Sequence, residues 1–288
     1  MKKVLFIIAA AAVAASVVSC DPEEQKKKDP AGGVDVAKEA LVAYFPFDET
    51  AADKVSKMEP KTATFEYVAG RRGKCIQGKE NAYILYELPA DSPLKSMKAI
   101  SVSMWLKQAP IPAEEAPVPL FMELGRAEDL FWGNFAISID RIGTKEEPSD
   151  KLGIKTATRI PWEGGYGNLW KTDGSGEYNI TANRWNHIIF VYDNITSEYH
   201  VFLNGVDTTP EGAVKCSAAD GNPLGDAAIA DSDKLVFGGW LPKILNNAND
   251  EWMGWFKGQM DEVRIFNRGL SAAEAKALYD AEVNAMDD

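Results

Sequence analysis

The strongest structural signal in the chain is the segment Arg184–Gly205, which reads RWNHIIFVYDNITSEYHVFLNG. From Trp185 to Asp193 it is almost continuously apolar, which is typical of a strand that is covered on both faces. A polar turn follows, and a second run from Tyr199 to Leu203 ends at Asn204-Gly205, a dipeptide that strongly favours a hairpin turn. The segment therefore predicts two consecutive strands, the first of them buried.

Several further segments alternate apolar and polar residues, which is the pattern of a strand with one buried face. In Ile100–Lys107, ISVSMWLK, the residues Val102, Met104 and Leu106 share one face. The other strand candidates are Leu41–Phe47, Thr62–Val68, Ala82–Glu87, Phe135–Asp140, Lys234–Gly238 and Gly258–Phe266.

One segment near the C-terminus predicts a helix. Ser271 and Glu274 form a capping-box pattern, and Ala272–Val283 carries good helix formers. About ten or more short strands, turn-rich connections and a single helix predict an all-β fold, a sandwich of two sheets. Neither a shift in composition nor a repeat divides residues 39–288, so we expect one domain there.

Four blocks of sequence resemble the laminin-G-like, concanavalin A-like jelly-roll family. The blocks are Leu41–Asp48, Gly70–Ile76 with Ile100–Lys107, Arg184–Asp193 with Val201–Gly205, and Phe256–Ser271. The last one reads FKGQMDEVRIFNRGLS, and together the blocks span nearly the whole predicted domain. The resemblance implies an antiparallel two-sheet jelly-roll sandwich and a module that most often binds glycans or proteins. Some relatives with this sandwich are glycoside hydrolases or lyases.

The N-terminus carries an export signal. Lys2 and Lys3 precede the apolar run Val4–Val18, whose fifteen residues are too few for a comfortable membrane span and suit a signal peptide. The tetrapeptide Val17-Val18-Ser19-Cys20 resembles the lipobox of bacterial lipoproteins, which implies a signal peptide over residues 1–19 and lipidation of Cys20. An ordinary signal peptide with a chance cysteine is the alternative. The charged, Pro- and Gly-containing residues 20–38 predict a flexible tether.

Acidic residues directly behind Cys20 bear on the location. They resemble the surface-export signal of lipoproteins in one group of Gram-negative bacteria, whereas in other Gram-negatives an aspartate beside the cysteine resembles an inner-membrane retention signal. We expect an outer-membrane protein that is held by its lipid and faces the cell surface. No second apolar run approaches eighteen residues, so the lipid is the only membrane attachment that we expect.

The chain is acidic, with a formal net charge of −12 that becomes −14 if Lys2 and Lys3 leave with the signal. This charge argues against nucleic acid and anionic membrane surfaces as partners, and it is compatible with neutral polysaccharides and Ca²⁺. Besides Cys20 only Cys75 and Cys216 remain. An exported protein permits a disulfide between them, and two isolated buried thiols are the alternative.

We find no catalytic constellation in the sequence. A glycosidase of this sandwich needs carboxylates on one face of a cleft, two residues apart on a strand. The pattern Glu-x-Asp-x-x-Glu is absent, and the adjacent Asp261 and Glu262 are expected to point to opposite faces. His187 and His200 lie in strand patterns, without a Ser or Cys elbow nearby, and are expected to be structural. We therefore expect no enzymatic activity.

Aromatic residues gather in segments that read as loops, where tryptophan and tyrosine rings can cover the apolar faces of sugars. The segment Ile160–Trp170, IPWEGGYGNLW, holds three of them among glycines. In a second segment Trp240, Trp252 and Trp255 surround an Asn-rich stretch, and we expect Trp132, which precedes Gly133-Asn134, to approach them. The predicted ligand-binding residues are Trp162, Tyr166, Trp170, Trp240, Trp252 and Trp132. The alternative is that these rings cap the sandwich under long loops. By contrast, Trp105 and Trp185 fall in strand blocks and are expected in the core.

Calcium is the one cofactor that the resemblance suggests. Relatives often hold a structural Ca²⁺ where the two chain ends meet, and the matching positions here are Asp48 or Asp53 with Asp261. Such an ion takes about six to eight oxygen ligands. The alternative is that Asp48 caps a turn and that Asp261 pairs with Arg264 or Arg268.

These observations favour a non-catalytic, cell-surface lipoprotein that binds a polysaccharide or another glycan beside an outer-membrane uptake or degradation system. A second interpretation is an adhesion or scaffold subunit of an outer-membrane complex, whose aromatic loops bind a protein. A third is a glycoside hydrolase of the concanavalin A-like fold with an unrecognised pair of carboxylates.

Overall fold

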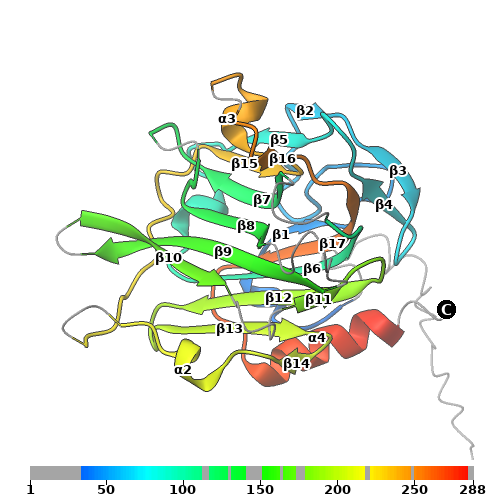
Figure 1. Ribbon diagram of the computed structural model, residues 1–288. Coiled ribbons are helices and arrows are strands. Elements are labelled where there is room, and N and C mark those ends of the chain that lie inside the picture. The colour runs from blue at the N-terminus through cyan, green and yellow to red at the C-terminus, as the bar shows by residue number, and fades with distance from the viewer. Residues whose placement is uncertain are drawn as a thin grey trace, which may run out of the picture.

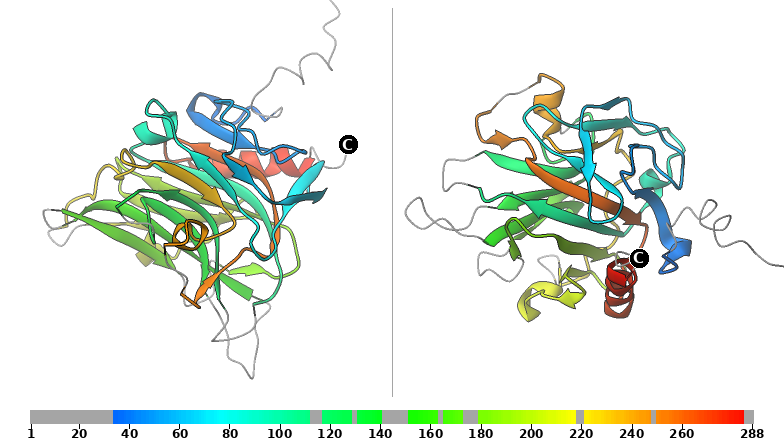
Figure 2. Two further views of the ribbon diagram at one scale, coloured as in Figure 1. Left: turned by 90° about the horizontal axis from the view of Figure 1, so that it is seen from above. Right: turned by 90° about the vertical axis from the view of Figure 1, so that its right-hand side faces the viewer.

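The computed structural model describes residues 34–111, 117–128, 131–140, 151–162, 165–172, 179–217, 221–247 and 250–284. Within these ranges two sheets face each other, and one helix lies outside the first sheet (Figure 1, Figure 2). The predicted signal peptide, Cys20 and most of the predicted tether lie outside the described residues, so the expectations about them stay predictions.

The first sheet has eight strands in the described residues, in the order β14-β13-β12-β6-β17-β4-β3, with β1 paired to β17. Its strands are β1 (Leu41–Phe45), β3 (Glu66–Ala69), β4 (Lys74–Gln77), β6 (Ile100–Gln108), β12 (Asn186–Asp193), β13 (Glu198–Leu203), β14 (Val206–Asp207) and β17 (Gly258–Phe266). All of its pairs are antiparallel. The first predicted strand pair is confirmed, because β12 pairs with β13 and is buried from Asn186 to Tyr192.

The second sheet has nine strands in the described residues, in the order β10-β9-β8-β7-β15-β5-β2, with β11 beside β9 and β16 beside β7. Its strands are β2 (Thr62–Ala63), β5 (Ile84–Glu87), β7 (Val118–Gly125), β8 (Phe135–Asp140), β9 (Lys151–Trp162), β10 (Gly165–Thr172), β11 (Asn179–Thr181), β15 (Lys234–Phe237) and β16 (Met253–Gly254). Its pairs are antiparallel except for the short parallel pair of β16 with β7. The all-β, antiparallel sandwich is therefore confirmed.

Three sequence expectations are corrected at the level of strands. The segment Thr62–Val68 is not one strand, because the chain leaves β2 in the second sheet and enters β3 in the first. Ile160–Trp170 is not a loop but the β9–β10 hairpin, with Trp162 opposite Gly165. Pairing along a sheet edge satisfies the backbone there, and it overrides the low strand propensity of the glycines. Trp185 precedes β12 and is partly exposed, so it lies outside the core.

Helices are few and mostly short. They are the 3₁₀ turns η1 (Lys38–Ala40) and η2 (Pro93–Ser96), and the α-helices α2 (Glu211–Val214), α3 (Leu241–Ile244) and α4 (Ala272–Asn284). The predicted C-terminal helix is confirmed as α4, with its capping box: Ser271 N–H donates to Glu274 Oε2 over 2.9 Å, and Glu274 N–H donates to Ser271 Oγ over 3.3 Å. Among the described residues no helix is long and apolar enough to cross a membrane.

The main core lies between the two sheets and is rich in aromatic rings. Phe45 of the first sheet packs its ring against Phe237 and Tyr86 of the second, with centroids 5.2 and 5.3 Å apart. Each such buried ring contributes on the order of 1.5–3 kcal/mol of hydrophobic stabilisation. The ring contacts join the sheets across the sandwich.

Helix α4 covers the outer face of the first sheet over a buried network of charged groups (Figure 2). Arg264 is 1% exposed and forms ion pairs with Glu282 of α4 and with Glu262. Trp105, which is buried as expected, donates its indole N–H to Glu282 Oε2 over 2.6 Å. This part of the first sheet is closed by the protein's own helix and leaves a ligand no access.

Candidate functional site

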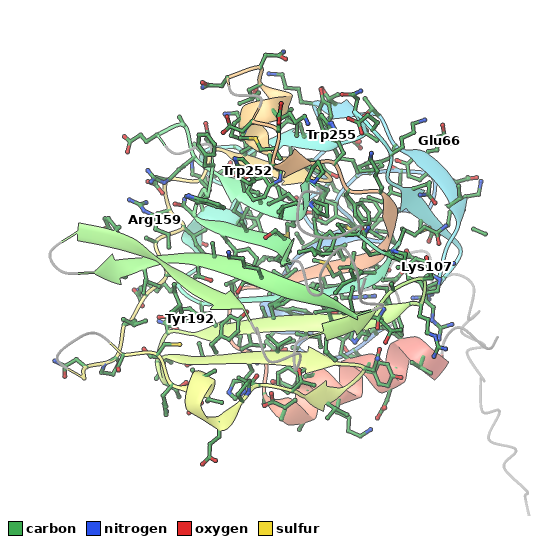
Figure 3. All side chains as sticks on the ribbon, in the orientation of Figure 1. Glu66, Lys107, Arg159, Tyr192, Trp252 and Trp255 are labelled. Atoms are coloured by element: carbon green, nitrogen blue, oxygen red, sulfur yellow. The ribbon has the colours of Figure 1, made fainter. Side chains whose placement is uncertain are left out.

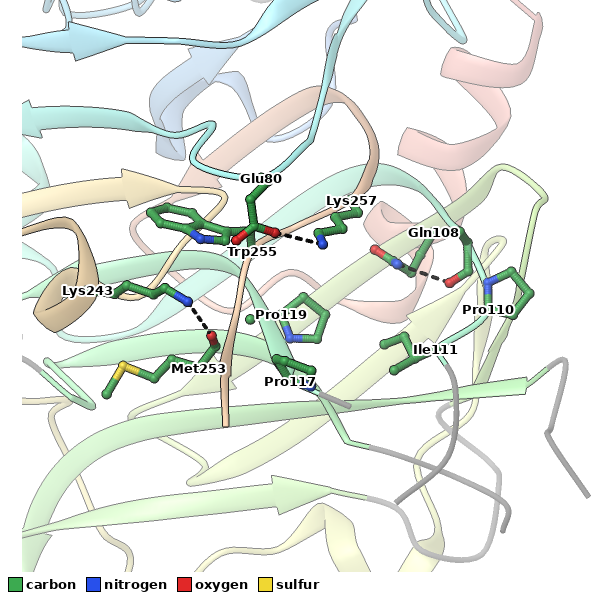
Figure 4. Close-up of a pocket in the computed structure, with 12 residues that line it drawn as sticks. Glu80, Gln108, Pro110, Ile111, Pro117, Pro119, Lys243, Met253, Trp255 and Lys257 are labelled. Carbon is green, nitrogen blue, oxygen red and sulfur yellow. Dashed lines mark hydrogen bonds and ion pairs between the residues drawn. The ribbon is translucent and has the colours of Figure 1, made fainter. Parts of the chain in front are cut away.

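A pocket of about 340 Å³ opens where β6 leaves the first sheet and β7 begins in the second (Figure 4). The segment Met253–Lys257, which holds β16, closes one side. Trp255 and Lys243 lie on one wall, Gln108 and Ile111 on the opposite wall, and Pro117 and Pro119 between them. The pocket therefore has an apolar lining with a few polar groups, as is usual for a small-molecule site.

Trp255 forms the aromatic wall of this pocket and is 7% exposed. One face of its ring stacks on Tyr83, with centroids 6.1 Å apart and 24° between the planes. Gly239 lies so close that a Cβ there would stand 2.5 Å from the indole Cζ3, so only glycine fits beneath the ring. The indole Nε1 is buried and has no hydrogen-bond partner among the described residues. The ring is thus firmly held while its one donor is unused.

Gln108, the last residue of β6, holds the second unused polar atom. Its Nε2 donates to the carbonyl oxygen of Ala109 over 3.0 Å. Since that carbonyl only accepts, the orientation of the amide is determined, and the side-chain oxygen Oε1 faces away from it. Gln108 is 3% exposed, and its Oε1 has no hydrogen-bond partner in the part of the chain that the structure describes. Figure 4 shows the amide pointing from its wall towards the side of the pocket where Trp255 lies.

Three charged side chains line the pocket. Glu80 and Lys257 form an ion pair of 2.8 Å at the rim, where both side chains are more than half exposed, so it contributes little to stability. Lys243 of α3 donates from Nζ to the carbonyl oxygen of Met253 over 2.9 Å. The same Nζ lies 5.4 Å from the centre of the Trp255 ring. The pocket can offer a ligand hydrogen bonds, an apolar wall and a positive charge.

A ridge of aromatic rings, made by Phe131, Trp132 and Trp252, lies over the second sheet beside the pocket (Figure 3 labels Trp252 and Trp255). The rings of Trp132 and Trp252 stack with centroids 6.0 Å apart, and Phe131 stacks on Trp252 at 6.4 Å. All three are partly buried. The sequence-predicted residues Trp132 and Trp252 therefore do come together, and Trp252 leads directly into the segment that closes the pocket.

Trp240 supports this ridge from below. It is 1% exposed, its ring centroid lies 4.9 Å from that of Trp252, and its indole N–H donates to the carbonyl oxygen of Val118 over 2.7 Å. The expectation that Trp240 contacts a ligand is corrected by this burial. The ring belongs to the small core that covers the second sheet, which is the capping role considered as the alternative for these residues.

Tyr166 lies on β10, well apart from the pocket. Its ring is 62% exposed and is covered on one side by the guanidinium of Arg159, 4.2 Å from the ring centre. Arg159 is held in turn by Asp231 at 2.9 Å. Figure 3 shows Arg159 far from Trp255, so this tyrosine is not part of the pocket. The side chains of Trp162 and Trp170 lie outside what the structure describes, and their roles stay predictions.

The three aspartates considered for Ca²⁺ are used in another way. Asp53 accepts the backbone N–H of Tyr44 and of Val55, Asp48 accepts that of Lys74, and Asp261 accepts those of residues 71 and 72 at 2.8 and 3.0 Å. Across the described ranges no group of three or more metal-ligating side chains is present. Their oxygens hold the chain's own loops in place, and a calcium ion at these positions stays a prediction.

The arrangement of the cysteines is also settled for the described residues. Cys75 and Cys216 are both buried and form no disulfide. Burial raises the pKa of the Cys75 thiol to about 12, so it stays protonated and unreactive at neutral pH. Of the two arrangements considered for this pair, the structure has the isolated buried thiols.

Sequence reasoning missed most of the pocket. Gln108 and Lys243 were not singled out, and Trp255 was noted without being chosen. One signal was available: prolines at positions 110, 112, 117 and 119 follow directly on the long strand that ends at Gln108. Proline presents rigid apolar surface, and Pro110, Pro117 and Pro119 line the pocket.

Comparison with known proteins gives a family and a fold. The model of the concanavalin A-like lectin/glucanases superfamily, in its laminin-G-like form, matches residues 79–276. No curated protein sequence matches the chain significantly. The name of the superfamily covers lectins, which bind sugars, and glucanases, which hydrolyse them, so this match leaves catalysis open.

Three solved structures illustrate the shared fold. Domain 4 of AbnA, a GH43 extracellular arabinanase from Geobacillus stearothermophilus in complex with arabinotriose, is 20% identical over 83% of this chain and 98% of that one, with a TM-score of 0.51. The binding domain of Paraclostridial Mosquitocidal Protein 1 is 15% identical over 84% of this chain and 52% of that one, with a TM-score of 0.53. A structure of botulinum neurotoxin type C, a toxin whose cell entry depends on interaction with two ganglioside molecules, is 11% identical over 85% of this chain and 51% of that one, with a TM-score of 0.53. The chain spans about half of the last two, and at these identities the likeness shows the fold alone.

Proposed function

The chain belongs to the concanavalin A-like lectin/glucanases superfamily, and from the geometry of its pocket we propose that it is a non-catalytic carbohydrate-binding protein. One observation carries the proposal: the pocket holds a buried indole N–H on Trp255 and a buried carbonyl oxygen on Gln108, both without partners. Leaving such groups unpaired costs about 1–3 kcal/mol each, which a suitable ligand would recover. Hydroxyl groups of a sugar can accept from the first and donate to the second.

Sugars match the remaining lining of the pocket. The indole ring of Trp255 and the rings of Pro110, Pro117 and Pro119 offer flat apolar surface to the C–H faces of a pyranose or furanose. A volume of about 340 Å³ is at the small end of the range for ligand pockets, which favours one end or one short segment of a polysaccharide. Proteins of the same fold bind arabinotriose and gangliosides, which supports this ligand class.

The carboxylates support binding over hydrolysis. Among the described residues that line the pocket, Glu80 is the only acid, and it is paired with Lys257. A glycosidase needs two carboxyl groups, about 5 Å apart for retention or roughly 6.5–9.5 Å for inversion. We therefore extend the proposal to a protein without catalytic activity, and the appearance of reducing ends in a polysaccharide would refute that part.

The proposed location rests on the N-terminal sequence. Lipid on Cys20 and a tether through residue 38 would hold the domain at the outer membrane, facing the cell surface, where many copies act together. A modest affinity per site is then enough for capture of a polysaccharide. The partly exposed ridge of Phe131, Trp132 and Trp252 favours a second candidate function, binding to a protein partner in the same membrane.

Native affinity electrophoresis tests the proposal directly. Residues 21–288, which lack only the signal and the lipidated cysteine, are run through gels that contain plant, host or microbial polysaccharides. We expect retardation by at least one polymer and a loss of at least about tenfold in affinity for Trp255→Ala, since buried aromatic anchors dominate such sites. Tyr166→Ala is the matched control, because that exposed ring lies outside the pocket. If no polymer retards the protein, carbohydrate binding is contradicted and the second candidate function, binding to a protein partner, is favoured.

A further inference from the structure

Lys243 is the unusual charge of the pocket. Its stem is half-buried in α3, and its only hydrogen bond within the described residues is the one to the Met253 carbonyl. Lys257, on the same rim, is neutralised by Glu80, but no ion pair neutralises Lys243 in the part of the chain that the structure describes. In a chain with a formal net charge of −12, the pocket lining is therefore a local site of positive charge.

Two donor groups of the pocket, on Lys243 and Trp255, lie on one wall. The Nζ of Lys243 lies 5.4 Å from the centre of the Trp255 ring, whose N–H has no partner. Figure 4 shows both side chains on the wall opposite Gln108. An ammonium and an indole N–H are both donors and accept nothing. The opposite wall offers the Gln108 oxygen, which only accepts. The pocket is therefore polarised, with donors at one side and an acceptor at the other.

We infer that the pocket takes a sugar residue that carries a carboxylate, a uronic acid, with its carboxylate on Lys243 and the Trp255 N–H and a ring hydroxyl on Gln108 Oε1. The inference rests on the proposed function and names the ligand class of the same site. A neutral sugar could use Gln108 and one N–H, but it would leave the Lys243 charge without a counter-ion. A carboxylate supplies that charge and two acceptor oxygens, and hydrogen bonds between charged partners are about twice as strong as neutral ones.

The charged side chains at the rim do not cancel the preference of the pocket for a carboxylate. Among the described residues, the titratable side chains that line the pocket are Glu80, Lys243 and Lys257, and the first and last neutralise each other. The net lining charge is thus that of Lys243. Because the chain as a whole is acidic, its net charge opposes binding of an acidic polymer, and the attraction that we infer acts at this pocket.

Isothermal titration of residues 21–288 tests the inference with three acidic probes, polygalacturonate, alginate and hyaluronan, each beside its carboxyl-reduced, neutral form. We expect at least one acidic probe to bind at least about tenfold more tightly than its reduced form. Lys243→Met, which keeps the length of the stem, should remove that difference, and raising the salt concentration should diminish it. Lys257→Met is the matched control, since it also removes one positive charge from the rim but one that is already paired.

The outcomes separate the two proposals. If neutral polysaccharides bind and depend on Trp255, while Lys243→Met changes nothing, the inference is overturned and the proposed function stands. If both lysine variants weaken the acidic probes equally, the attraction is general and the inference is overturned as well. If no polysaccharide binds, the proposed function fails and the inference fails with it. Thermal unfolding of each variant shows whether it is folded before its binding is compared.

Discussion

The pocket and the face of the first sheet under α4 both hold tryptophan and charged side chains, but these side chains differ in whether they have hydrogen-bond and ion-pair partners. Under α4, the Trp105 indole N–H donates to Glu282, and Glu282 pairs with Arg264. In the pocket, the Trp255 N–H and the Gln108 carbonyl oxygen are buried with no partner. The network under α4 pairs the charges that hold the fold together, although within the described residues it also leaves His187 Nδ1 without a partner, and we propose that the unpaired atoms at the pocket are the ones that a ligand uses. Burial alone therefore does not distinguish a structural tryptophan from a binding one.

The largest change in the free energy of unfolding is expected when the buried ion pairs of Arg264 under α4 are broken. Arg264→Met removes the cation between Glu262 and Glu282, so that among the described residues Glu262 keeps only Arg72 and Tyr44 as partners and Glu282 keeps only Trp105 and His187. We expect the free energy of unfolding to fall by about 3–5 kcal/mol, measured by urea denaturation. The control Lys276→Met breaks the exposed pair with Asp280 and should change it by less than about 0.5 kcal/mol. Equal effects of the two variants would show that the network does not stabilise the fold.

The pH dependence of stability gives the next test of the buried charges. Burial raises the pKa of Asp261 to about 8, against the pull of the N–H groups that it accepts. The folded chain then keeps a proton that the unfolded chain releases near pH 4, so this residue makes stability decline as the pH rises from about 4 to about 8. Asp261→Asn should flatten the decline in melting temperature over that range, and an unchanged slope would contradict the assignment.

The two tryptophans can be compared directly by the same substitution. Trp105→Phe leaves Glu282 without one of its donors, and we expect a loss of roughly 2 kcal/mol of stability, since the acceptor is charged and buried. Trp255→Phe removes an N–H that bonds to nothing in the protein, so its loss of stability should be smaller while its affinity for glycan falls by about tenfold. A larger stability loss at Trp255 would assign that ring to the core.

The smallest change in stability is expected at the acceptor wall. Gln108→Met keeps the size of the side chain and removes an unpaired carbonyl oxygen. We expect the free energy of unfolding to stay within about 1 kcal/mol of the original, because an unsatisfied buried group and one part-buried hydrogen bond to the neighbouring residue are lost together. Affinity for the glycan should still fall, as titration calorimetry would show. A variant that binds normally would remove Gln108 from the site.

Patterns along the chain were sufficient for most of the fold. The apolar run of β12, the alternation in β6 and the capping box of α4 each depend on neighbours within one element, so they are visible in the sequence. The β9–β10 hairpin was missed because its glycines carry little strand propensity and its stability comes from pairing with its neighbours. The break between β2 and β3 was missed because the two pieces join different sheets.

The sequence by itself determined the family, the two-sheet sandwich, the helix at its end and the presence of aromatic rings near its loops. It could not separate Trp240, Trp252 and Trp255, which lie within sixteen residues of one another. Only the tertiary structure showed that the first donates to Val118, that the second lies in a ridge and that the third faces a pocket with its N–H unused. The physical reason is that periodicity reports which face of an element is buried, whereas hydrogen-bond partners for a side chain come from residues far away in the chain.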